Sequence, residues 1–295
     1  MLIKRPVFCF EIKRDQLSII GCRGILLVLI FTSCTYSPQS KIHIDEENFI
    51  LIEAIINKEK MNFIFDTCAE ATVIAKGLAE ALGLSAHRSI TINNIPVDIV
   101  YIPTLEINGI KLFQVEAAVI DMSNETFSNG GYGGILGLNV INLFVWDFDL
   151  IKRKLQIYQG KPKLKTNAAV IDYQKIEQTG LPFVQIHLDF FQSDAVFFDT
   201  GFTGFLSANH LKDTALLEFN KFTESQKFLF GAEDQMVAHY TARDFELFGK
   251  YFEEQTLIHN VHPKRDKDFI GSLFVQSFNR FVFNPIDSQI LLELE

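Results

Sequence analysis

The chain has 295 residues, about twice the length of a typical domain, which predicts two domains or lobes. Apolar residues make up 48% and charged residues 21%, a composition that is globular rather than disordered. The net charge of −9 excludes electrostatic attraction to nucleic acid, because such a surface repels phosphates. Four cysteines are too few for a disulfide-dense scaffold. We therefore expect a two-lobed globular protein with no nucleic-acid partner.

The N-terminus has the order of an export signal. Basic residues precede an apolar run of seven residues from Ile25 to Phe31, which Thr32-Ser33-Cys34 follows. Such a run is too short to cross a bilayer, which takes about 20 residues, but it suits a signal peptide. Residues 31–34 resemble the bacterial lipoprotein signal, although Phe31 stands where that signal usually has Leu. The alternative is a buried N-terminal helix with an incidental cysteine.

These features predict an exported lipoprotein anchored in a membrane of the bacterial cell envelope. Residues 1–33 are then the signal peptide, and Cys34 is the lipidated first residue of the mature chain. Residues 34–47, which begin with a segment rich in Ser, Pro and Gln, are expected to form a tether between membrane and domain.

Two patterns recur in the chain at almost the same spacing. Phe65-Asp66-Thr67 returns 133 residues later as Phe198-Asp199-Thr200, and the apolar-apolar-Gly run at 135–137 returns 134 residues later at 269–271. Matched spacing of two separate motifs indicates a tandem duplication. We therefore predict an N-terminal lobe over residues 48–160, a linker over 161–175 and a C-terminal lobe over 176–295.

Each repeat is predicted to be mainly β. An apolar run over 49–56, a polar turn and a second apolar run into Asp66 indicate a β-hairpin, and residues 181–200 repeat it without a gap. A short amphipathic helix follows over 76–82, with Gly83 as its expected C-terminal cap. The remaining expected strands cover 89–92, 97–102, 105–107, 110–113, 115–120, 144–148, 154–158, 245–258, 280–283 and 290–294.

The two Asp-Thr pairs are the strongest candidates for chemistry. A single Asp in such a turn is usually an Asx-turn that caps its own backbone. Two of them in equivalent positions of a duplicated chain can meet on a pseudo-two-fold axis. Two carboxyls at hydrogen-bond distance share one proton, so that one acts as a base toward water and the other as an acid toward a carbonyl.

Residues 66–74 resemble the active-site loop of retropepsin-like aspartic proteases, whose pattern is Asp-Thr-Gly-Ala, two polar residues, Thr and an aliphatic residue. Residues 78–84 are similar to the short helix that follows this loop in bacterial members, and residues 135–137 resemble the family's apolar-apolar-Gly signature. With the second copies, the resemblance covers nearly all of residues 48–295.

The resemblance implies a bilobal aspartic-protease fold, with two pseudo-two-fold-related β-barrel-like lobes and short helices. Asp66 and Asp199 are then the catalytic residues. Thr67 and Thr200 are then hydrogen-bonded across the lobes, where they lock the two loops. The supporting position after each Asp-Thr pair is Gly201 in the second copy and Cys68 in the first.

Cys68 departs from the family, which has Gly at that position. A cysteine restricts the backbone and adds a side chain beside the scissile bond, which threatens the catalytic rate more than the fold. A thiol beside two carboxyls should have a raised pKa and be a poor nucleophile. We therefore expect Cys68 to be buried and inert.

The expected function is that of an aspartic endopeptidase acting as a monomeric, single-chain pseudo-dimer. Water is the nucleophile, so the mechanism needs neither a metal nor another cofactor. An extended peptide or protein substrate is expected in the cleft, with Glu70, Asn93 and Asn94 as candidate contacts. Flaps are expected near residues 93–97 and 231–235.

Two alternatives to this function remain open. One is a non-catalytic peptide-binding lipoprotein on the same fold, impaired by Cys68. The other is a structural surface lipoprotein in which the Asp turns are scaffolding. Retention of both Asp-Thr pairs argues against the second alternative, because a structural turn needs neither residue in both halves.

Overall fold

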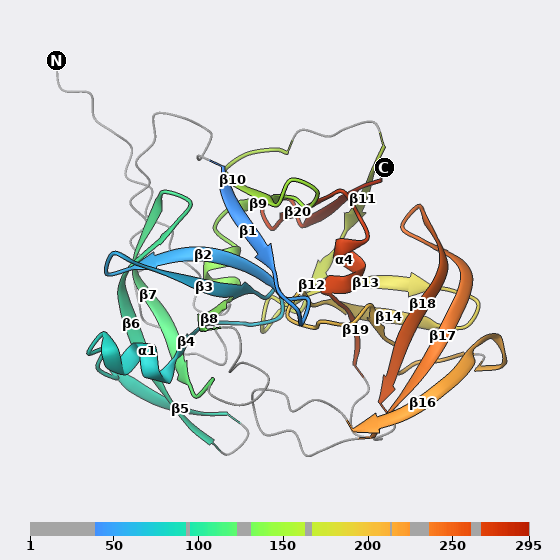
Figure 1. Ribbon diagram of the computed structural model, residues 1–295, viewed down its shortest axis with the longest axis horizontal. Coiled ribbons are helices and arrows are strands. Elements are labelled where there is room, and N and C mark those ends of the chain that lie inside the picture. Colours follow the sequence, from blue (N-terminus) through green and yellow to red (C-terminus); the bar gives the residue numbers. More distant parts are fainter. Residues whose placement is uncertain are drawn as a thin grey trace.

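The computed structural model consists of two β-rich lobes with a shared sheet between them (Figure 1). It describes residues 39–92, 95–122, 131–162, 167–212, 214–224, 236–260 and 267–294. The predicted signal peptide, Cys34, Asn93, Asn94 and the second flap at 231–235 lie outside the described residues.

The first lobe is built on a closed barrel. Its strands, in order around the barrel, are β2 (Ile50–Ile56), β3 (Glu59–Phe65), β8 (Tyr132–Leu136), β4 (Thr72–Ala75), β7 (Ile110–Ile120) and β6 (Ile95–Ile107), and β6 pairs back with β2. The predicted hairpin that leads into Asp66 is confirmed as β2 and β3. Asn57 and Lys58 form its turn, both with positive φ, as a two-residue hairpin turn requires.

Short elements complete this lobe. β5 (Arg88–Ile92) extends the sheet beside β6. The predicted helix is confirmed as α1 (Lys76–Ala81), which buries Ala79, and α3 (Leu138–Ile141) follows β8. The four short strands expected between 97 and 120 are instead the two long strands β6 and β7. The pairing skips only Pro103 and Gln114, the latter at positive φ, and its register is the same on either side of them.

Within the described residues, the second lobe repeats the strand pairings of the first except for the β2–β6 pairing that closes its barrel. Its sheet runs β12 (Gln174–Lys175), β13 (Pro182–His187), β14 (Gln192–Phe198), β19 (Asp268–Ile270), β15 (Leu206–Ser207), β18 (Lys250–Asn260), β17 (Met236–Leu247) and β16 (Glu218–Glu224). Parallel pairing of Phe198 with Ile270 repeats that of Phe65 with Leu136. The helix α4 (Ser272–Gln276) takes the place of α3, and η2 (Thr214–Leu216) precedes β16. The duplication is therefore present in the structure as well as in the sequence.

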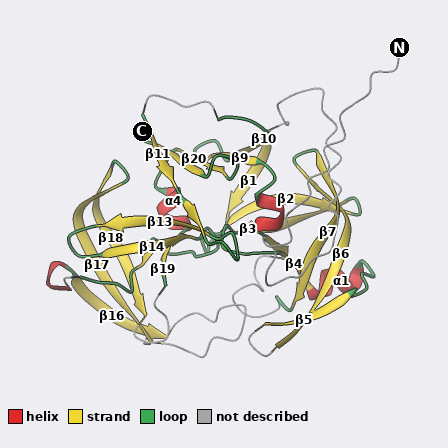
Figure 2. Cartoon of the chain, turned by 180° about the vertical axis from the view of Figure 1, so that it is seen from behind, coloured by secondary structure: helices red, strands yellow, loops and turns green. Residues whose placement is uncertain are grey.

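Six strands from both halves form one sheet between the lobes. The order is β11 (Ala168–Asp172), β21 (Gln289–Glu293), β20 (Arg280–Asn284), β9 (Val145–Asp149), β10 (Lys154–Tyr158) and β1 (Ser40–Ile44). Figure 2 shows this layer above and between the two lobes. The halves meet where β9 pairs antiparallel with β20, with Phe148 opposite Phe281. These two rings stack at 5.4 Å between centroids.

This shared sheet corrects three predicted boundaries. Ser40–Ile44 is strand β1, which pairs with β10 and β2, so the tether expected over 34–47 was wrong for these residues. The linker expected over 161–175 contains β11 and β12. The C-terminal lobe expected over 176–295 ends before β20, because residues 280–293 join the shared sheet.

The shared core anchors the segments that lead into both Asp residues. Phe65, fully buried, packs on Trp146 and Phe148 with ring centroids 5.2 and 4.9 Å apart. Phe198, also fully buried, stacks on Phe281 at 5.7 Å. The residue before each catalytic candidate is therefore fixed in the core that joins the halves.

Candidate active site

Asp66 and Asp199 stand at equivalent ends of β3 and β14. The backbone N–H of Asp66 donates to the carbonyl of Leu136 at 3.2 Å, and that of Asp199 donates to the carbonyl of Ile270 at 2.8 Å. Each bond ties the turn to the parallel neighbour, β8 or β19, just before the glycine of the apolar-apolar-Gly signature. The fold therefore brings the two predicted catalytic residues to the boundary between the lobes.

The two threonines bond across this boundary, as the resemblance implies. The backbone N–H of Thr67 donates to Oγ1 of Thr200 at 3.1 Å, and the N–H of Thr200 donates to Oγ1 of Thr67 at 3.1 Å. The hydroxyl of Thr67 donates to the carbonyl of Phe198, and that of Thr200 donates to the carbonyl of Phe65 at 2.7 Å. Both threonines are fully buried, so the four hydrogen bonds that fix one loop against the other are shielded from solvent.

Each carboxyl group is held by its own turn. Oδ1 of Asp66 accepts the backbone N–H of Cys68 at 2.7 Å and that of Ala69 at 3.0 Å. Oδ1 of Asp199 accepts the N–H groups of the two equivalent residues, Gly201 and Phe202, at 2.9 and 3.1 Å. The two carboxyls also form a hydrogen bond with each other. One oxygen of each group is thus fixed by backbone donors.

The two half-buried carboxyls favour a state with one shared proton. Burial raises the pKa of Asp66, while the N–H donors of Cys68 and Ala69 oppose that rise. Burial also raises the pKa of Asp199 well above its ordinary value, and the charge of Asp66 raises it further. Two neighbouring carboxylates resist joint ionisation, so the pair favours a state in which the two groups share one proton.

The apolar-apolar-Gly signatures support the loops from behind. The N–H of Leu138 donates to the carbonyl of Ala69 at 2.7 Å, and the N–H of Ser272 donates to that of Phe202 at 2.8 Å. A Cβ at Gly137 would lie 2.7 Å from the backbone nitrogen of Thr72, which is closer than real Cβ atoms come. Glycine is therefore required for the loop to pack this closely.

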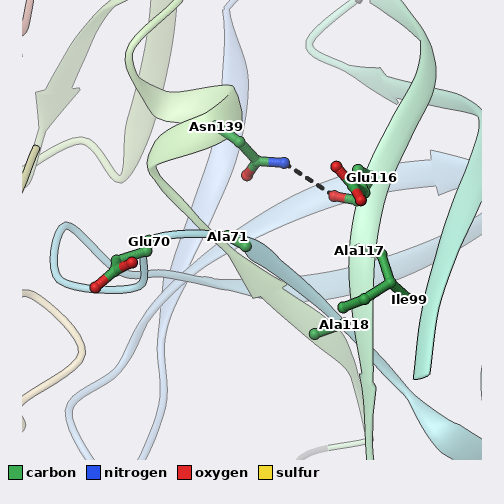
Figure 3. Close-up of a pocket in the computed structure, with 7 residues that line it drawn as sticks. All are labelled: Glu70, Ala71, Ile99, Glu116, Ala117, Ala118 and Asn139. Atoms are coloured by element: carbon green, nitrogen blue, oxygen red, sulfur yellow. Dashed lines mark hydrogen bonds between the residues drawn. The ribbon is translucent and has the colours of Figure 1, made fainter. Parts of the chain in front are cut away.

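Asn139 braces the first loop and was not predicted from the sequence. Its Oδ1 accepts both the N–H and the hydroxyl of Thr72 at 2.8 Å, and its Nδ2 donates to the carbonyl of Glu116 at 2.9 Å. Figure 3 shows Asn139 pointing toward Glu116 across a small pocket. The only signal in the sequence was a polar residue within the apolar run that follows Gly137.

Glu70, a predicted substrate contact, lies at the edge of the same pocket. In Figure 3 its side chain points away from Asn139 and Glu116. Burial raises the pKa of Glu70, while the positive charge of Lys267 lowers it. Lys267 comes from the other lobe and was not predicted, although the duplication aligns it with Gly133, just before the apolar-apolar-Gly signature.

Cys68 preserves the turn that glycine forms in the second copy. Its N–H still donates to Asp66, and its thiol donates to the carbonyl of Phe198 at 3.7 Å. Burial raises the pKa of the Cys68 thiol well above its ordinary value, and the charges of Asp199 and Asp66 raise it further. The predicted direction of this shift is confirmed.

Comparisons with known proteins find similarity to aspartic proteases. Residues 52–140, from β2 to α3, match the family model described as aspartyl protease. The resemblance of this segment to the aspartic proteases is confirmed. A solved structure, the retropepsin-like aspartic protease from Rickettsia conorii, has 20% identity over 43% of this chain and 96% of its own, with a TM-score of 0.33. No curated protein matches the chain in sequence.

The chain thus has the bilobal aspartic-protease fold, formed by two lobes of one polypeptide. Its first lobe carries the family match, and its second lobe repeats the strand pairings and the Asp-Thr turn of the first. Within the described ranges, no helix is long and apolar enough to span a membrane.

Proposed function

We propose that this protein is an aspartic endopeptidase that hydrolyses peptide bonds with Asp66 and Asp199. The observation that carries the proposal is the pair of mutually hydrogen-bonded carboxyls, each anchored through Oδ1 by two backbone N–H groups. Fixed dipoles of this kind hold a catalytic pair in place before substrate arrives. Protease function in general is supported by the family match over residues 52–140.

In the proposed reaction, Asp66 is the base and Asp199 the acid. The Asp66 carboxylate takes a proton from water, the hydroxide formed adds to the peptide carbonyl carbon, and Asp199 gives its proton to the carbonyl oxygen. The resulting diol returns a proton to Asp199 while Asp66 gives its proton to the nitrogen, and the C–N bond breaks. One water is consumed and the dyad returns to its starting state.

The proposed substrate is an extended peptide lying between the lobes. The β5–β6 hairpin of the first lobe is equivalent to the β16–β17 hairpin of the second. In each lobe the outer strand, β5 or β16, pairs with the first strand of a long antiparallel pair, β6–β7 or β17–β18. Both hairpins lie at the same end of the molecule (Figure 1), and exposed Ile95 and Phe219 lie on them. Such hairpins suit a substrate that adds a strand through main-chain hydrogen bonds.

The alternative of a non-catalytic peptide-binding protein rests on Cys68 alone. The short hydrogen bond from its N–H to Asp66 favours catalysis, because the donor that glycine normally supplies is retained. The hydrogen bond between the carboxyls also favours an enzyme over a structural surface protein, since a turn that only caps its own backbone needs no partner carboxyl.

The proposal includes export and a lipid anchor at Cys34. Its support is the order of basic residues, a short apolar run and small residues before Cys34. A tether then leads to β1, and the monomer contains both halves of the site. The partners are the peptide or protein substrate and the membrane of the cell envelope.

The direct test of the proposed activity uses the purified chain and a diverse peptide mixture between pH 3 and 7. We expect internal cleavage that is strongest where the dyad holds one proton and that fades as the second carboxyl ionises. Mass spectrometry of the products identifies the cleaved bonds. Absence of cleavage across all peptides and pH values would contradict the proposed activity.

A further inference from the structure

The loop that carries Asp199 lacks the side-chain brace of its counterpart in the first lobe. There, Oδ1 of Asn139 accepts both the N–H and the hydroxyl of Thr72 at 2.8 Å. The duplication aligns Asn139 with Leu273, whose apolar side chain cannot form hydrogen bonds and is 39% exposed. The Asp199 loop must therefore be held by other contacts.

Ser272, at the start of α4, connects the Asp199 loop to the first half of the chain. Its backbone N–H donates to the carbonyl of Phe202 at 2.8 Å, and the N–H of Phe202 donates to Oδ1 of Asp199 at 3.1 Å. The hydroxyl of Ser272 donates to the carbonyl of Asn48 at 2.8 Å. Ser272 is fully buried. The Asp199 carboxyl is therefore linked to the turn between β1 and β2 through two residues.

The turn that accepts the Ser272 hydroxyl is itself fixed within the first half. The N–H of Asn48 donates to the carbonyl of Asp45 at 3.1 Å, and Oδ1 of Asp45 accepts the N–H of Phe49 at 2.8 Å. The hydroxyl of Tyr132, on β8, also donates to the Asp45 carboxylate. These bonds hold the Asn48 carbonyl in place, so it is a fixed anchor for Ser272.

We infer that Ser272 is a positioning residue that fixes the Asp199 carboxyl relative to the first half of the chain. It acts through the backbone of Phe202, while the Asn48 carbonyl holds its own side chain. The duplication aligns it with Leu138, which has no hydroxyl. Accurate placement matters for catalysis, because a displacement of about 1 Å can lower the rate about 100-fold.

Gln276 provides the matched control for Ser272. Its Nε2 donates to the same Asn48 carbonyl at 3.0 Å, from the other end of α4. Ser272→Ala and Gln276→Ala each remove one hydrogen bond from this acceptor and leave it the other, so urea unfolding should show similar losses of stability. Ser272→Ala alone releases the residue whose N–H contacts Phe202.

NMR of the full chain measures the placement of Asp199 without relying on activity. The amide signal of Phe202 and the ¹³C-carboxyl signal of Asp199, identified with Asp199→Asn, are followed from pH 3 to 9. In Ser272→Ala the amide signal should shift, and the Asp199 titration should move up by about half a pH unit. The direction follows because the Phe202 N–H lowers the pKa of Asp199, and a looser donor lowers it less. Gln276→Ala should match wild type in both signals.

The other titratable groups beside Asp199 are the same in all these proteins. Among the described residues, they are Asp66, whose charge raises the pKa of Asp199, and the Cys68 thiol, whose pKa the Asp199 charge raises. Ser272→Cys keeps nearly the same size with a weaker donor, so it should shift both signals in the same direction but less. Unchanged signals in the Ser272 variants, or equal shifts in Gln276→Ala, would overturn the inference.

A kinetic test rests on the proposed peptidase activity. Ser272→Ala should lower kcat about tenfold with KM unchanged, while Gln276→Ala should stay within about twofold of wild type. A merely structural role would lower the activity of both variants alike, which would overturn the inference, as would an unchanged kcat in Ser272→Ala. If wild type cleaves nothing, the proposed function fails, whereas the NMR signals still decide whether Ser272 positions Asp199.

Discussion

Thr67 and Thr200 exchange hydrogen bonds across the boundary between the two halves of the chain. Each backbone N–H donates to the hydroxyl of the other threonine at 3.1 Å, and each hydroxyl donates to the carbonyl two residues before the other threonine. Because every bond joins one lobe to the other, a change at either threonine acts on both Asp-Thr loops. The threonines therefore couple the stability of the lobe boundary to the geometry of the dyad.

Removal of one hydroxyl should weaken both the fold and the proposed catalysis. Thr67→Ala leaves the buried N–H of Thr200 and the buried carbonyl of Phe198 each without one partner, which costs about 1–3 kcal/mol of unfolding free energy. Urea unfolding measures this loss, and peptide cleavage should fall with it. Thr67→Ser keeps the hydroxyl and should recover most of both.

Thr91, exposed on β5, provides the matched control for this substitution. Thr91→Ala should change the free energy of unfolding by no more than about 0.5 kcal/mol, as at ordinary surface sites. Equal losses in Thr67→Ala and Thr91→Ala would show that the cross-lobe bonds do not stabilise the protein.

A buried ion-pair network joins the halves within the shared sheet. The guanidinium of Arg280 donates to both carboxylate oxygens of Asp147 at 2.7 Å and also to Glu293. These three side chains are at most 15% exposed. Arg280→Ala leaves two buried carboxylates without this partner and should cost about 3–5 kcal/mol, measured by urea unfolding at pH 7.

Arg243 offers the exposed counterpart to this network. It contacts Glu218 and Glu254 at 3.1 Å, with its side chain 57% exposed. Exposed pairs contribute about 0–1 kcal/mol, so Arg243→Ala should have a small effect. If Arg243→Ala were as destabilising as Arg280→Ala, burial would not be the reason for the strength of the Arg280 network.

The dyad should cost stability at neutral pH. The folded-state pKa of Asp199 is raised, so its stabilising contribution is complete below the unfolded value of about 3.9 and is lost as pH rises through the folded value. Asp199→Asn cannot ionise and escapes that loss. We therefore expect the variant to be more stable than wild type at pH 7, with a gain that shrinks toward pH 3.

Thermal unfolding of both proteins across this pH range measures the gain. Asp194→Asn, at an exposed site on the strand that leads into Asp199, is the control and should stay within about 0.5 kcal/mol of wild type at every pH. A variant Asp199→Asn that is less stable than wild type at pH 7 would show that the carboxyl pair stabilises the fold there.

Cys34 is predicted to carry the lipid anchor. Cys34→Ser removes the acceptor sulfur, so the protein should leave the membrane fraction or keep its signal peptide uncut. Fractionation and mass spectrometry of the mature N-terminus measure both outcomes. Cys68→Ser is the control, because Cys68 lies in the active-site loop far from the signal. Wild type that retains residues 1–33 intact would contradict the lipoprotein prediction.

The sequence predicted those parts of the fold that depend on local pattern and on the repeat. The hairpins before Asp66 and Asp199 are short-range features, and their matched spacing identified the duplication. The strand at Ser40–Ile44 was missed although it pairs with the neighbouring β2, because three acidic residues follow it directly and hide the hairpin pattern. Its other partners, residues 154–155, lie more than 100 positions away and leave no local signature.

The candidate site, like the fold, was predicted only in part. The Asp-Thr pairs belong to a recognisable pattern, and the structure brings them together as expected. Asn139, Lys267 and the contact between Cys68 and Phe198 depend on which segments the fold brings together. Asn139 is one polar residue in an apolar run, and nothing in its sequence neighbourhood identifies Thr72 as its partner.

Cleavage of a single peptide by wild type, Asp66→Asn and Asp199→Asn, at the pH of maximal wild-type activity, tests the central claim most directly. Each substitution keeps the shape of the side chain while removing one carboxyl from the acid–base exchange. Circular dichroism and thermal unfolding confirm that all three proteins are folded. We predict cleavage by wild type and a loss of at least about 100-fold in each variant. Cleavage that survives both substitutions would contradict the account, because the chemistry would then lie outside the dyad.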